Sequence, residues 1–181
     1  VDAPTLVRID STGREHRVSS FSHEAGRIQW SPALERIYWS ETKADTRWTL
    51  ETESRIRYIG KDGKGSLRSS GLIHNPSASG DRIAAVRYEI GGRSVLEIMD
   101  GKTGNILDSF TAPDSLQLVE TAWIGDTVYA TGISENGYGI YGIASSGGPW
   151  KKILSPQPVM MKDFGSYGDE LMFTCDRTGV N

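Results

Sequence analysis

The segment Leu171-Met172-Phe173-Thr174-Cys175 decides the fold, because it is the last of four copies of one pattern. In each copy a charged turn, here Gly168-Asp169-Glu170, leads into a short run of β-branched, aliphatic and aromatic residues. Such runs between turn residues predict β-strands. The other three copies are Glu35–Ser40, Gly80–Val86 and Gly125–Thr131.

The four copies recur at a nearly constant spacing. A period in the forties that is built from strands indicates a β-propeller, in which each repeat forms one four-stranded antiparallel blade. We therefore predict an all-β fold with about four blades' worth of chain. The steps are 46, 45 and 43 residues when the copies are aligned on Ile37, Ile83, Val128 and Leu171.

A second set of hairpins alternates with the first. Each has two short strands and a turn that contains glycine, as tight hairpin turns require. We expect these to be outer hairpins of successive blades, at 5–18, 56–67, 95–107 and 139–154. The first set then supplies the inner hairpins, whose first strands are expected to end near Trp30, Asn75, Trp123 and Phe164.

The order of these hairpins sets the expected domain organisation. Two explanations fit it: a segment of a larger propeller, or a closed four-bladed ring in which the last inner hairpin pairs with the first outer hairpin. We favour the segment, with the remaining blades in a longer parent chain, because four blades is the lower end of the usual range. The single propeller unit covers 1–181, with an outer hairpin at 1–19, whole blades near 24–69, 71–112 and 117–155, and an inner hairpin at 159–181.

One insertion interrupts the regular spacing. Thr42–Ser54 lengthens the first whole blade, and Trp48 and Leu50 alternate there with polar residues, which favours extended strand. We expect Trp48 to pack on the blade's own surface rather than to anchor a ligand. Packing between blades is expected for the tryptophans at repeat positions, which are Trp30, Trp39, Trp123 and Trp150.

Composition argues against several classes of function. The formal net charge of -3, with both signs interspersed, favours neither a nucleic-acid surface nor a polybasic membrane patch. No apolar run approaches the roughly 18 residues of a membrane span. No signal segment precedes the first strand, although a start at Val1 in mid-repeat leaves export open. Cys175 is the single cysteine, so no internal disulfide is expected, and its strand position predicts a buried, unreactive thiol.

Two kinds of catalytic or phosphate-binding motif are present only in part. Phe164–Gly168 lacks the first glycine of the Gly-x-Ser-x-Gly nucleophile elbow, and the repeat places Ser166 in a hairpin turn rather than a strand-to-helix turn. Gly101-Lys102-Thr103 and Gly63-Lys64-Gly65 lack the rest of a phosphate-binding loop and lie in repeated turns. The structural interpretation is preferred for all of them, and no catalytic residue is predicted.

No metal or cofactor is predicted either. The histidines His16, His23 and His74 lack metal-ligand spacing, and the aspartates of the turns are too dispersed for a calcium loop. If a ligand binds, propeller geometry favours one mouth of the central channel. The repeat register suggests four candidate ligand-binding residues there, which are Gln29, His74, Glu120 and Asp163.

Several turns resemble those of a known family. Trp30–Tyr38 and Gly80–Ala84 are similar to the Ser-Pro-Asp-Gly-x-x-Ile-Ala-Phe motif of TolB-like, WD40-like propeller blades, and Asn75–Asp81 is a further variant. Ile140–Gly148 resembles the outer-hairpin motif Ile-Tyr-x-x-x-x-x-Gly-Gly of the same family. The Asp-Gly of the first motif is absent from every copy, and the third copy lacks Ser-Pro, which leaves the subfamily open.

The resemblance implies a non-catalytic module that binds a protein or peptide partner, in the periplasm, at the cell surface or secreted. Related propellers form the gating domain of prolyl-oligopeptidase-type serine peptidases, which is the alternative. A third hypothesis is an intact propeller hydrolase or lyase that acts on sugars through Glu120 or Asp163. Fold alone does not decide among these functions.

Overall fold

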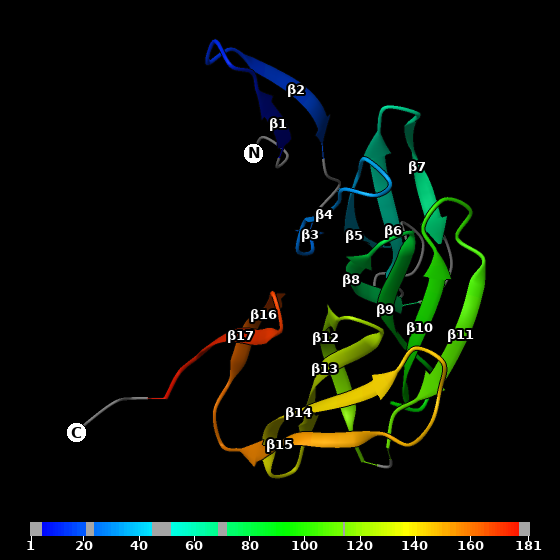
Figure 1. Ribbon diagram of the computed structural model, residues 1–181, viewed down its shortest axis with the longest axis vertical. Helices are drawn as coiled ribbons and strands as arrows, with labels where there is room; N and C mark the ends of the chain where they lie inside the picture. Colours follow the sequence, from blue (N-terminus) through cyan, green and yellow to red (C-terminus); the bar gives the residue numbers. More distant parts are fainter. Residues whose placement is uncertain (1–4, 21–23, 45–51, 69–71, 114, 178–181) are drawn as a thin grey trace.

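The computed structural model describes residues 5–20, 24–44, 52–68, 72–113 and 115–177 (Figure 1). Every regular element in these ranges is a β-strand, and all strand pairs are antiparallel. The described part of the chain has no helix that could cross a membrane. The predicted all-β class is thus confirmed.

Three sheets form whole blades, each built from strands that are consecutive in the sequence. Blade 1 contains β3 (Glu24–Ala25), β4 (Gln29–Ser31), β5 (Arg36–Ala44), β6 (Thr52–Gly60) and β7 (Gly63–Arg68), with β3 and β4 both paired to β5 as one interrupted inner strand. Blade 2 contains β8 (Leu72–Ser79), β9 (Arg82–Tyr88), β10 (Ser94–Asp100) and β11 (Ile106–Thr111). Blade 3 contains β12 (Gln117–Ile124), β13 (Thr127–Ser134), β14 (Gly137–Ala144) and β15 (Lys151–Gln157).

Two further hairpins flank the three blades. Among the described strands, β1 (Thr5–Ile9) pairs with β2 (Glu15–Ser20), and β16 (Met161–Tyr167) pairs with β17 (Glu170–Cys175), each as a separate two-stranded sheet. Figure 1 shows the blades as an arc with these hairpins at its two ends. The structure therefore contains four-stranded antiparallel blades, as the repeats predicted.

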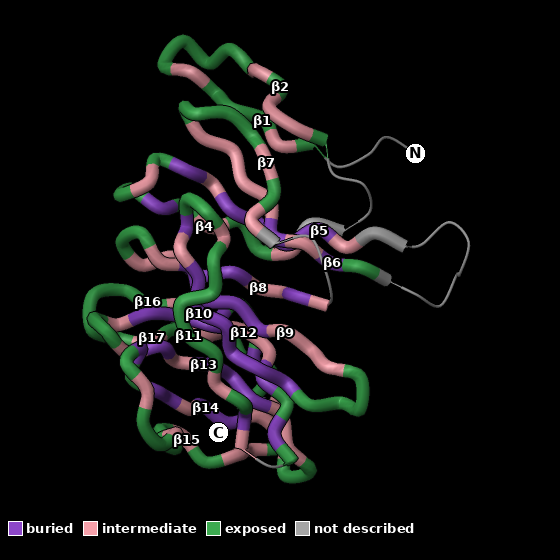
Figure 2. Tube along the Cα trace, turned by 90° about the vertical axis from the view of Figure 1, so that its right-hand side faces the viewer, coloured by how far each residue is buried: buried purple, intermediate pink, exposed green. Residues whose placement is uncertain are grey.

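The middle strands of blade 2, β9 and β10, are buried on both faces, which explains their nearly continuous apolar sequence (Figure 2). Successive side chains of a strand point to opposite faces. Ile83 and Ala85 belong to the core shared with blade 1, whereas Ala84 and Val86 belong to the core shared with blade 3. A third core, around Phe164, joins blade 3 to the β16–β17 hairpin.

Two of the inner strands continue beyond the points at which the sequence predicted that they end. β8 runs on to Ser79 and β16 to Tyr167, and each contains a register shift near Asn75 or Asp163. Asn75 has φ 51° and Asp163 has φ 54°, a conformation that asparagine and aspartate adopt more readily than most residues. A bulge, rather than a strand end, therefore occupies these positions.

Two predictions of burial are wrong, because the side chains concerned are exposed in the described structure. Cys175 is exposed near the end of β17, and Trp30 is 55% exposed in β4. Trp39 and Trp123 are buried, as expected for tryptophans between blades, and Trp150 is partly buried against the core between blades 2 and 3. β5 and β6 extend into the insertion to Ala44 and Thr52, but Trp48 and Leu50 lie outside the described residues.

An arginine at the start of β5 ties blade 1 to blade 2. The Arg36 guanidinium donates to the Asp62 carboxylate and, at 2.8 Å, to the carbonyl of Gly101 in blade 2. It also lies 4.1 Å from the centroid of the Tyr58 ring. The hydrogen bonds to Arg36 hold the pKa of the Asp62 carboxyl below its usual range.

Arg82 occupies the equivalent position in blade 2 and makes the same type of contact with blade 3. Its guanidinium donates to Asp126 at 2.7 Å and to the Ser145 hydroxyl at 2.8 Å, and it lies 5.0 Å from the centroid of the Trp123 ring. Thr127 stands at this position in blade 3, where it begins β13. The arginine contact is thus a repeated inter-blade bond in the first two blades.

We predict that Arg36→Met lowers the free energy of unfolding by about 2 kcal/mol, because hydrogen bonds to a charged group are lost while the aliphatic stem is kept. Urea unfolding should show a lower midpoint with an unchanged slope. Thr127→Ala, at the equivalent position without an arginine, should change the midpoint much less. Equal losses in both variants would contradict a specific role for the arginine.

Candidate functional site

One side of the arc carries the connections between blades, and we call it the connector face. The inner strands β8 and β12 start on this side, and the outer strands β7 and β11 end there. The turns 89–93 and 134–137 lie on it as well, because β9 and β13 run toward it. This face therefore combines loops from neighbouring blades, which is where binding residues commonly gather on a rigid scaffold.

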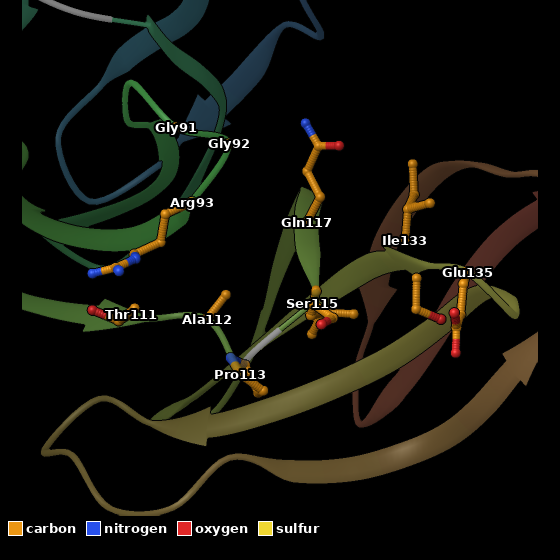
Figure 3. Close-up of a pocket in the computed structure, with 12 residues that line it drawn as sticks. Gly91, Gly92, Arg93, Thr111, Ala112, Pro113, Ser115, Gln117, Ile133 and Glu135 are labelled. Atoms are coloured by element: carbon orange, nitrogen blue, oxygen red, sulfur yellow. The ribbon is translucent and has the colours of Figure 1, made fainter.

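The connector face has a cleft of about 590 Å³ between blades 2 and 3 (Figure 3). Figure 3 shows Arg93 and Glu135 on opposite sides of the cleft, with Ser115 and Gln117 between them. A positively charged and a negatively charged side chain thus border the cleft, whose remaining surface is mostly polar. The lining residues are Gly91, Gly92, Arg93, Thr111, Ala112, Pro113, Ser115, Leu116, Gln117, Ile133, Ser134 and Glu135.

The buried Ser94 hydroxyl fixes the connector that forms the floor of this cleft. It accepts a hydrogen bond from the backbone N–H of Leu118 at 2.9 Å and donates to the carbonyl of Leu116 at 3.2 Å. The N–H of Ala112 donates to the Ser94 carbonyl at 3.0 Å. Ser94 of blade 2 therefore holds Ala112 on one side of this connection and Leu116 and Leu118 on the other.

The turn beside the cleft presents a fully exposed isoleucine. Ile90 has a relative exposure of 108%, and Gly91 and Gly92 follow it with φ values of 101° and 83°. The turn is closed, because the N–H of Glu89 donates to the Arg93 carbonyl at 2.8 Å. An apolar side chain held in water by a closed turn is a candidate anchor, since burying it against a partner is favourable by about 1.5–3 kcal/mol.

Polar contacts between the inner strands surround the axis of the arc. The Glu120 carboxylate accepts from the backbone N–H of Phe164 at 2.9 Å, and Asn75 donates through its side chain to the carbonyl of Val119 at 2.8 Å. The Arg27 guanidinium donates to the carbonyl of Phe164, which joins blade 1 to the β16–β17 hairpin. These contacts connect four successive inner strands.

The structure places two of the four predicted ligand-binding residues next to each other. Glu120 reaches the backbone beside Asp163, which in turn accepts from the Thr174 hydroxyl at 2.9 Å within its own hairpin. Both carboxylates thus take part in contacts of the inner strands. Gln29 is half-buried in β4 opposite Tyr38.

His74 lies in the interface between blades 1 and 2. Its Nε2 is 3.3 Å from the Ser54 hydroxyl of blade 1, and its ring centroid is 5.6 Å from that of Tyr88. Burial lowers the pKa of His74 below its usual value, so the imidazole is neutral at physiological pH. The geometry therefore gives His74 a structural position between the two blades.

Sequence reasoning did not select the cleft residues. Their only local signal is Gly91-Gly92, a turn that requires positive φ, because the cleft itself arises from loops of two blades. Within the described ranges, no three His, Cys, Asp or Glu side chains gather as metal ligands. Ser166 lies in β16 opposite Leu171 of the antiparallel β17, so it has no strand-to-helix turn of the nucleophile-elbow type.

No protein-family model matches this sequence, and no curated protein matches it. Solved structures with the same fold are found at low identity. TolB from Acinetobacter baumannii is 17% identical, with a TM-score of 0.69 over 98% of this chain and 44% of TolB. The chain solved in a nidogen/laminin complex is 15% identical, with a TM-score of 0.69 over 94% of this chain and 64% of that one.

A third similar structure is the β-propeller domain of the Trilobed protease from Pyrococcus furiosus, which is described as having an open velcro topology. It is 12% identical, with a TM-score of 0.58 over 87% of this chain and 51% of that domain. The present chain spans less than two thirds of the length of all three structures. These likenesses establish a β-propeller fold and confirm the resemblance at the level of the fold.

The position of His74 predicts a pH dependence of stability. The unfolded chain binds a proton at about pH 6.5, whereas the native chain does so only at lower pH, so protonation favours unfolding as the pH falls below 6.5. His74→Gln should remove this loss, which amounts to at most about 1.4 kcal/mol per pH unit. Urea unfolding of both proteins at pH 7.5 and 5.5 tests it. A difference in unfolding free energy between the two proteins that is the same at both pH values would contradict this prediction.

Proposed function

We propose that this chain is a non-catalytic β-propeller module that binds an extended peptide or a protein loop on its connector face. The cleft of about 590 Å³ beside the fully exposed Ile90 carries the proposal. The cleft presents a cation at Arg93 and an anion at Glu135, and Ile90 adds an apolar anchor in the adjoining turn. A small set of polar groups next to an apolar anchor is typical of sites that recognise peptides.

The structural likenesses agree with this role without identifying a partner. One similar chain was solved in a complex of nidogen with laminin, which is a protein–protein assembly. The periplasmic, cell-surface or secreted location is part of the proposal and comes from the resemblance to TolB-like propellers. The interspersed charges and the net charge of -3 favour a protein partner over nucleic acid.

A second candidate is the gating domain of a serine peptidase. The likeness to the propeller domain of the Trilobed protease, with its open velcro topology, favours it, because the first and last described hairpins of this chain do not pair with each other. A fluorophosphonate probe that labels active serine hydrolases, applied to the product of the full reading frame, tests this candidate. Labelling would support the gating role, and its absence would oppose it.

Panning a random dodecapeptide library displayed on phage against the folded chain tests the peptide-binding proposal. We predict an enriched peptide whose affinity falls at least about tenfold with Ile90→Asp, because an Ile anchor contributes about 1.5–3 kcal/mol when buried. Fluorescence polarisation of the labelled peptide measures this change, and circular dichroism confirms folding.

The matched control is Leu107→Asp, in the same blade. Leu107 is 50% exposed and lies near the start of β11, away from the connector face. The Leu107→Asp variant should bind the enriched peptide with unchanged affinity. Equal losses in the two variants, or a library that yields no enriched sequence, would overturn the assignment of this face.

A further inference from the structure

The cleft between Arg93 and Glu135 has both of its walls in whole blades. Blade 2 contributes the turn that carries Arg93 and blade 3 contributes the turn that carries Glu135, and each of these blades contains all four of its strands. Ala112 and Leu116 line the cleft and also belong to the core that the two blades share. The geometry of the cleft is therefore set by these two blades and the connection between them.

The wall of blade 2 carries the positive charge of Arg93. The backbone of this residue is fixed, because its carbonyl accepts from the N–H of Glu89 at 2.8 Å. Its side chain is exposed, and within the described residues it forms no hydrogen bond or ion pair. Two acidic residues of the same blade are already engaged elsewhere, because Arg87 donates to Glu97 at 2.6 Å and to Glu89 at 3.1 Å. The Arg93 guanidinium is thus accessible to an acidic group of a ligand.

The wall of blade 3 carries the negative charge of Glu135, in the turn between β13 and β14. Ser134 closes this turn, because its hydroxyl accepts from the N–H of Asn136 and donates to the carbonyl of Gly137, both at 3.3 Å. The Glu135 side chain is exposed, and its carboxylate forms no hydrogen bond or ion pair in the part of the chain that the structure describes. This carboxylate is therefore accessible to a basic group of a ligand.

Uncharged hydrogen-bonding groups lie between the two charges. Figure 3 shows Ser115 and Gln117 between Arg93 and Glu135. Ser115 and Gln117 are both exposed, and a hydroxyl and a carboxamide can each donate and accept hydrogen bonds. The backbone of an extended peptide presents the complementary donors and acceptors. From blade 2 to blade 3 the cleft thus offers a cation, then neutral polar groups, then an anion.

This arrangement disfavours ligands that carry charge of one sign only. A nucleic acid or an anionic lipid surface would be attracted by Arg93 but repelled by Glu135. A ligand that compensates both residues carries an acidic and a basic group, separated by a polar chain. A peptide with one acidic and one basic side chain meets this requirement, and the cleft volume of about 590 Å³ lies in the range of ligand-binding clefts.

We propose that the cleft selects peptides by charge, with Arg93 binding the carboxylate of an acidic side chain and Glu135 binding the ammonium or guanidinium group of a basic one. This selectivity rests on the proposed peptide-binding function and adds to it the sequence pattern of the peptide. Because Ile90 belongs to the same turn as Arg93, the apolar residue that contacts Ile90 lies closer to the acidic than to the basic residue of the peptide. The two charges thereby fix which end of the peptide lies on which blade.

Charge reversal in both partners tests this selectivity. A peptide that the wild-type chain enriches from the dodecapeptide library should carry an acidic and a basic residue, and its labelled form serves for fluorescence polarisation. Arg93→Glu should lower its affinity at least about tenfold, because an attraction is replaced by a repulsion between like charges. A second peptide, in which Lys replaces the acidic residue, should bind the Arg93→Glu variant at least about fivefold more tightly than the first peptide does. Glu135→Arg should be rescued only by a peptide in which Glu replaces the basic residue.

Lys152→Glu is the matched control, because it reverses a charge at an exposed position near the start of β15, at the opposite end of blade 3 from the turn with Glu135. This variant should bind the first peptide with unchanged affinity, and circular dichroism confirms the fold of every variant. Enriched peptides that lack either charge, or an affinity that falls with Ile90→Asp but not with Arg93→Glu, would overturn charge selection alone. Reversals that the matching peptides do not rescue would do the same. A library that yields no enriched peptide would overturn peptide binding, and charge selection with it.

Discussion

The whole structure depends on the burial of blade faces against neighbouring blades. A strand such as β9 has apolar side chains on both faces, with Ile83 turned to blade 1 and Val86 turned to blade 3. Neither face could stay in water without a large loss of hydrophobic stabilisation, so a single blade has no stable existence by itself. Blade 2 therefore acquires its stability from the two blades beside it, and the polar contacts of Arg36 and Arg82 fix how these neighbours are oriented.

This dependence explains what could be predicted from the sequence. The spacing between Ile37, Ile83, Val128 and Leu171 reflects one strand of each unit, so the repeat pattern was sufficient for the all-β class and for the order of the strands. The same reasoning failed at two positions whose surroundings differ from those of their repeat equivalents. Cys175 and Trp30 carry the pattern of packed residues, yet the described structure leaves both of them exposed.

The candidate site was less accessible to sequence reasoning, for a physical reason. The repeat pattern aligns equivalent positions of the inner strands, and it therefore selected both Glu120 and Asp163. The register shifts that accompany the bulges of β8 and β16 cannot be seen in the repeat pattern. The cleft between Arg93 and Glu135 depends on the shapes of two turns and one connection, none of which repeats from blade to blade. Irregular segments on a regular scaffold are where the binding properties of such a protein would differ from those of its structural neighbours.

The approach of Arg27 to β16 has a consequence for passage along the axis. Its guanidinium contacts the Phe164 carbonyl, and a Cβ atom at Gly165 would lie 2.9 Å from its Nη2, so a larger residue at position 165 would require the end of the arginine side chain to shift. A polypeptide threaded through the middle of the arc would have to break this contact and displace the arginine.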